Sequence, residues 1–135
     1  MKIFDCFMFY DEKILLDIRL NVLNEFVDYF VIVESKYFHN GLKRELNFNI
    51  NDYPKFKDKI IYIVHDNRLL ELEEINLNDD EESKTFKLNF NAHARENDQR
   101  NHILNGLKSS NDDDLILISD VDEIPNLKKL NLNYI

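Results

Sequence analysis

The chain has 135 residues, of which 44% are hydrophobic, and a net charge of −9. This size and composition indicate one globular domain, residues 1–135, whose core needs no disulfides. The acidic balance argues against nucleic-acid partners, because phosphate backbones are held mainly by clustered Lys and Arg. A single cysteine, Cys6, with no signal peptide and no apolar run long enough to span a membrane, predicts a cytoplasmic protein.

Apolar runs and helical periods alternate along the chain, and this alternation predicts β-α-β units. In chain order we expect a strand at 3–10, a helix at 13–24 capped by Asp11, strands at 29–33 and 60–64 separated by a helical turn at 53–57, a helix at 92–107, a strand at 115–118 and a last helix opening near 124–126. The acidic segment 66–84 lacks a clean period and predicts a loop excursion. The fold class is therefore α/β, with a mostly parallel sheet covered by helices on both faces.

The most informative stretch is the end of the last predicted strand. Four aliphatic residues at 115–118 are followed by Ser119, Asp120, Val121, Asp122 and Glu123. Ligands of open α/β sheets lie at the carboxyl ends of strands, and a hard divalent cation relieves the repulsion between clustered carboxylates. The motif therefore predicts a metal site, and the alternative is a solvated loop whose acids cap the following helix.

Segments spread over nearly the whole chain resemble glycosyltransferase family 17, which includes the bisecting β-1,4-N-acetylglucosaminyltransferases. They are residues 4–7, 15–20, 27–34, 57–61, 99–101, 106–107 and 113–125. The resemblance implies a GT-A-like fold and a divalent metal, Mn²⁺ or Mg²⁺. It also implies an inverting transfer of a sugar such as N-acetylglucosamine from a UDP-sugar donor to a hydroxyl of a glycan acceptor.

The resemblance assigns roles to three acidic residues. Asp120 and Asp122 match the D-x-D motif of the family, which implies that both bind the metal and that Asp120 also contacts the nucleotide sugar. Glu34, at the end of the second predicted strand, matches a family acid near the nucleotide. The catalytic base cannot be assigned from the sequence.

The helix predicted at 92–107 carries the other donor-site candidates. Arg100 and Asn101 match a family segment that faces the nucleotide, and Glu96 and Gln99 lie on neighbouring turns. An arginine suits this position, because Arg pairs bidentately with phosphate and the two glycines of the chain cannot form a Gly-rich phosphate loop.

The chain also departs from the family pattern. Residues 38–44 match only in part, and the chain has no Trp where many relatives carry one before Glu96. Relatives continue well beyond the D-x-D motif with the acceptor site, so we expect this chain to be a truncated, donor-binding part. An open sheet edge would then favour self-association.

Two other functions stay open at this point. The alternative to catalysis is a non-catalytic remnant that binds a nucleotide sugar and lacks the acceptor half. A D-x-D phosphotransferase fits less well, because that class carries its motif near the start of the chain.

Three other residue types favour structural roles. Arg19 lies in a helix expected to pack beside the sheet, which favours a structural ion pair. Cys6 is flanked by aromatic residues and indicates a buried strand position. The four histidines show no metal-ligand spacing along the chain, so surface or capping roles are expected.

Overall fold

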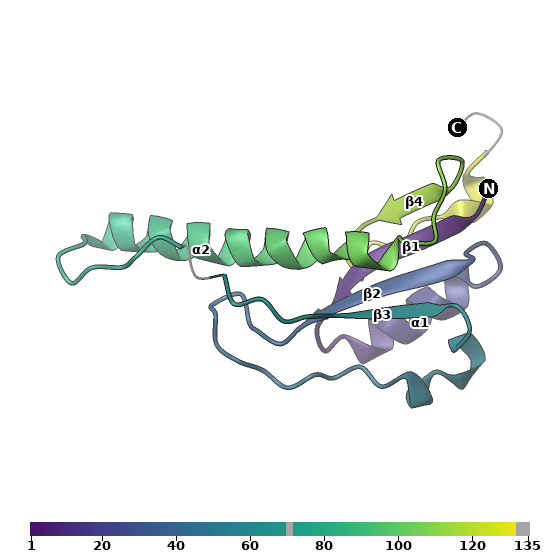
Figure 1. Ribbon diagram of the computed structural model, residues 1–135, viewed down its shortest axis with the longest axis horizontal. Helices are drawn as coiled ribbons and strands as arrows, with labels where there is room; N and C mark the ends of the chain where they lie inside the picture. Colours follow the sequence, from purple (N-terminus) through teal and green to yellow (C-terminus); the bar gives the residue numbers. More distant parts are fainter. Residues whose placement is uncertain (70–71, 132–135) are drawn as a thin grey trace.

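The computed structural model describes residues 1–69 and 72–131, in which strands and helices alternate (Figure 1). The strands and α-helices are β1 (Ile3–Phe9), α1 (Lys13–Leu23), β2 (Tyr29–Ser35), β3 (Ile60–His65), α2 (Glu81–Asn101) and β4 (Leu115–Ile118). Short 3-10 helices are η1 (Ile50–Asp52), η2 (Pro54–Phe56), η3 (His102–Gly106) and η4 (Leu127–Lys129).

The four strands form one parallel sheet in the order β3-β2-β1-β4. The α/β class and the parallel sheet predicted from the sequence are therefore confirmed. The carboxyl ends of the strands all lie at the same edge of the sheet, because the strands run in one direction. The finer GT-A likeness and self-association through an edge strand stay predictions.

The strand order reverses direction beside β1. The chain adds β2 and β3 on one side of β1 and then crosses to place β4 on the other side. The connection from β3 to β4 runs through α2, which lies on the opposite side of the sheet from α1 (Figure 1). A ligand crevice is expected where the strand order reverses, which here is the carboxyl end of β1 and β4.

The alternation of side chains along β1 divides the core into two layers. Phe7 and Phe9 pack with Leu16 and Leu20 of α1, together with the 3-10 helices η2 and η4. The neighbouring residues of β1 point to the other face, where Phe4 and Cys6 pack against Ile103 of η3. Both faces are covered, as the continuous apolar runs predicted.

Three features of the helices differ from the prediction. The N-cap position of α1 is occupied by Glu12 rather than Asp11, and the Glu12 side chain makes no cap hydrogen bond to the helix but accepts from the amides of Tyr10 and Asp11. Helix α2 begins at Glu81, inside the predicted loop excursion, and Asp80 caps it by accepting from the Ser83 amide at 2.7 Å. The last predicted helix is only the single turn η4.

Helix α2 was predicted to begin eleven residues too late because its first half lacks a buried stripe. Phe86, Leu88 and Phe90 are all exposed, and this half of α2 extends beyond the sheet (Figure 1). The predicted end near Gly106 is correct, although the last turn is the 3-10 helix η3. A Cβ on Gly106 would lie 2.3 Å from Val31 Cγ1, so only glycine allows this close packing.

No helix among the described residues is long and apolar enough to cross a membrane. The cytoplasmic location stays a prediction.

The Cys6 thiol should be chemically inert in the folded protein. It is fully buried, and burial raises its pKa to about 12, so the reactive thiolate is scarce at neutral pH. We expect iodoacetamide at pH 8 to leave Cys6 unmodified in the native chain and to alkylate it completely in denaturant, as measured by mass spectrometry. Rapid alkylation of the native chain would contradict this buried position.

Candidate functional site

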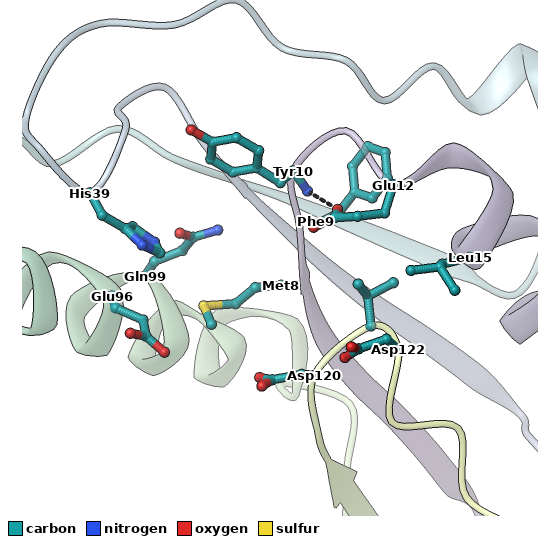
Figure 2. Close-up of a pocket in the computed structure, with 11 residues that line it drawn as sticks. Met8, Phe9, Tyr10, Glu12, Leu15, His39, Glu96, Gln99, Asp120 and Asp122 are labelled. Carbon is teal, nitrogen blue, oxygen red and sulfur yellow. Dashed lines mark hydrogen bonds between the residues drawn. The ribbon is translucent and has the colours of Figure 1, made fainter.

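A cavity of about 440 Å³ opens at the carboxyl ends of β1 and β4, where the strand order reverses (Figure 2). Its walls come from the end of β1, the start of α1, the loop after β2, the last turns of α2 and the turn after β4. The lining residues are Met8, Phe9, Tyr10, Glu12, Leu15, His39, Glu96, Gln99, Asp120, Val121 and Asp122. Its volume suits a small organic ligand.

The D-x-D motif forms the turn that closes one side of this cavity. Val121 is buried in the core cluster on the α1 face, and this anchor leaves Asp120 and Asp122 exposed on either side of it. Both carboxylates point into the space between the turn and α2 (Figure 2). The Asp122 carboxylate makes no hydrogen bond or ion pair with any residue of 1–69 or 72–131, so its oxygens are free for a ligand.

A buried arginine holds the D-x-D turn in place. Arg19 of α1 pairs bidentately with Asp5 of β1, with both distances at 2.8 Å and both side chains fully buried. Its remaining N–H groups donate to the Asp120 carbonyl at 2.6 Å, to the Glu123 carbonyl at 3.3 Å and to Ser119 Oγ at 2.7 Å. The structural ion pair predicted for Arg19 is confirmed, and its second role is to shape the turn.

Helix α2 brings a positive charge next to the motif. Arg100 Nη2 lies 2.9 Å from Glu96 Oε1 and 3.4 Å from Asp120 Oδ1, and 38% of its side chain is exposed. Gln99 is buried and donates to the Val33 carbonyl at 3.2 Å, which fixes this turn of α2 against β2. The guanidinium therefore lies beside the cavity, on an anchored part of the helix.

A second buried arginine shapes the opposite wall. Arg44 donates to the Tyr10 carbonyl at 2.7 Å and to the Ser35 carbonyl at 2.6 Å, and its guanidinium stacks on the Tyr10 ring at 4.3 Å. Its ion-pair partner is Glu34, at 3.1 Å. The pKa of Tyr10 is raised, mainly because the side chain is partly buried. The phenol of this cavity residue is therefore neutral at physiological pH.

The structure places Glu34 inside this wall rather than on the surface of the cavity. The carboxylate is fully buried and accepts from the amides of Asn47 and Phe48 and from the Tyr62 hydroxyl, at 2.7 to 2.9 Å. Together with Arg44 these bonds use the acceptor capacity of Glu34. Glu34 therefore holds the backbone of the loop at 47–48 in place.

Four of the predicted site residues line the cavity, namely Glu96, Gln99, Asp120 and Asp122. Arg100 lies beside it, whereas Glu34 and the exposed Asn101 are not among its lining residues. Sequence reasoning missed Tyr10, Glu12 and His39. The signal for Tyr10 was present, because it is the last residue of the first predicted strand and parallel strands end at the same edge of a sheet.

The exposed carboxylates of the D-x-D turn fit a hard divalent cation. Oxygen ligands suit Mn²⁺ and Mg²⁺, and sites of this kind commonly use one or two carboxylates and take further ligands from substrate phosphates and water. Asp122 has no competing partner among the residues that the structure describes, and Asp120 is 58% exposed. The residues present are therefore compatible with the metal that the resemblance implies.

Residues 1–134 match the model of Glycosyltransferase family 17. The chain belongs to this family. The match confirms the resemblance seen in the sequence and identifies the protein as a glycosyltransferase with sugar donor and acceptor substrates. No curated protein and no solved structure matches the chain.

Removing Arg19 should destabilise the fold strongly. In the variant Arg19→Met, the Asp5 carboxylate stays buried without its partner, which costs about 3–5 kcal/mol in free energy of unfolding. We expect urea unfolding to show this loss. The double variant Asp5→Leu with Arg19→Met should recover part of it, since no buried charge is then left.

The matched control is Lys13→Met, which changes an exposed cation on the same helix. Its free energy of unfolding should change by at most about 0.5 kcal/mol. A similar loss in Arg19→Met and Lys13→Met would contradict the buried role of Arg19.

Proposed function

We propose that this glycosyltransferase binds a UDP-sugar and a divalent metal in the cavity between α2 and the D-x-D turn. The transfer we propose is inverting, with N-acetylglucosamine as the sugar and a glycan hydroxyl as the acceptor. The observation that carries the donor site is the free Asp122 carboxylate beside Asp120 in a cavity where the strand order reverses. The sugar, the acceptor and the stereochemistry rest on the family resemblance.

Each cavity residue has a role that its chemistry supports. Asp122 and Asp120 would hold Mn²⁺ or Mg²⁺, which when bound neutralises the diphosphate and stabilises the departing UDP. Arg100 would release part of its contact with Glu96 and Asp120 to pair with a phosphate oxygen. The Tyr10 ring, which lines the cavity and carries a neutral phenol, would offer a surface for the nucleotide or the sugar.

The other carboxylates at the cavity are engaged locally. Glu12 accepts from two backbone amides of its own turn, and Glu96 pairs with Arg100. Neither is therefore assigned as the base that deprotonates the acceptor hydroxyl. Donor binding without turnover, the non-catalytic alternative, is an outcome that the same assays would reveal.

Asp122→Ala should remove metal-dependent donor binding. We expect calorimetric titration of the unchanged chain with UDP to show binding in Mn²⁺ that disappears in EDTA, and Asp122→Ala to show none in either condition. The matched control is Asp112→Ala, which removes the same charge from an exposed turn. Unchanged UDP affinity in Asp122→Ala would contradict the assignment.

Arg100→Gln should weaken UDP binding by about 10- to 100-fold, because a hydrogen bond between charged groups contributes about 1.5–3 kcal/mol. Lys108→Gln is the control, since it removes the same charge from an exposed position after α2. Equal weakening in both variants would mean that general electrostatics, rather than a contact to phosphate, is responsible.

A further inference from the structure

Two histidines and an aspartate meet where the end of α2 and η3 reach the end of β3. They are His65 at the end of β3, Asp98 near the end of α2 and His102 at the start of η3. One ligand atom from each lies within 4.8 Å of the other two. None of the three lines the D-x-D cavity, so the cluster is separate from the proposed donor site.

The local hydrogen bonds leave the ligand atoms turned toward one another. His102 Nδ1 lies 2.8 Å from the Asp98 carbonyl, which can only accept, so Nδ1 carries the proton and Nε2 keeps its lone pair. His65 Nδ1 contacts Ser35 Oγ at 2.7 Å, and His65 Nε2 lies 2.6 Å from Asp98 Oδ2. A bond to the far ring nitrogen is what orients a histidine that ligates a metal.

We propose that His65, Asp98 and His102 bind one Zn²⁺ ion, with water as the fourth ligand. Two imidazole nitrogens and one carboxylate form a donor set that Zn²⁺ favours. Tetrahedral ligands around zinc lie about 3.3 Å apart. The contact between His65 and Asp98 therefore widens by a small rotation of Asp98, whose side chain is 22% exposed and can move.

With three protein ligands the ion would keep one open position, and the burial of His65 would anchor it in the fold. His65 is 2% exposed and is held from behind by Ser35, and Asn67 Nδ2 donates to the Asp98 carboxylate at 3.0 Å. The ion would fasten the end of β3 to the last turns of α2. Those turns also carry Gln99 and Arg100, so the site would hold the cavity wall from its outer side.

Co²⁺ titration of the untagged, chelator-stripped chain tests the proposal. We expect the intense visible bands of four-coordinate Co²⁺ to saturate at one equivalent and to disappear when one equivalent of Zn²⁺ is added. Zn²⁺ should also raise the Tm, because an ion that binds only the folded state stabilises it. A folded chain that shows neither bands nor a rise in Tm would overturn the site and leave a hydrogen-bonded cluster.

Variants locate the ion. His102→Gln and Asp98→Asn should weaken Co²⁺ affinity by about 100-fold or more, because loss of a residue that only supports a ligand already costs about 10- to 100-fold, and should abolish the rise in Tm with Zn²⁺. Two controls should keep both properties: His93→Gln, whose side chain on α2 is 77% exposed, and Asp122→Asn in the D-x-D turn. Loss of Co²⁺ binding in either control would overturn the assignment. Because Co²⁺ spectra and Tm do not involve UDP, failure here leaves the proposed function intact.

Discussion

The buried ion pair between Arg19 and Asp5 is the interaction on which the site depends. It joins the central strand β1 to α1, and the three remaining contacts of Arg19 reach the turn after β4. Two charges without exposure to water are costly unless every hydrogen-bonding group is used, and here the guanidinium is fully engaged. The geometry of the D-x-D turn is therefore set from inside the core.

A second charged pair has the corresponding role on the other side of β1. Glu34 and Arg44 are both buried, and their contacts join the ends of β1 and β2 to the loop at 44–48. The buried charged side chains therefore hold backbone segments in place, whereas the two aspartates of the D-x-D motif remain exposed at the cavity. Within the described part of the chain Asp122 has no partner, whereas Glu34 has four, and this contrast separates a residue available to a ligand from one that supports the wall.

The sequence predicted the sheet well because its strands are buried on both faces and read as continuous apolar runs. It also placed Asp120 and Asp122 correctly at a strand end beside a cavity. The start of α2 was missed because an exposed half-helix has no apolar period, although Asp80 followed by Glu81 and Glu82 is a helix-start signal. The partners of Glu34 lie 10 to 28 positions away, and no local pattern reveals such pairing.

The histidine cluster also could not be predicted from local sequence patterns. His65 and Asp98 are 33 positions apart, so a search for ligand spacing along the chain could not join them. The fold brings these two residues together. The end of α2 reaches β3 through the crossover connection, which also contributes a wall of the cavity. Gln99 faces β2 and the cavity, while its neighbour Asp98 faces β3. One helical turn thus supports two polar sites, and the position of Arg100 beside the D-x-D turn depends on how firmly that turn is held.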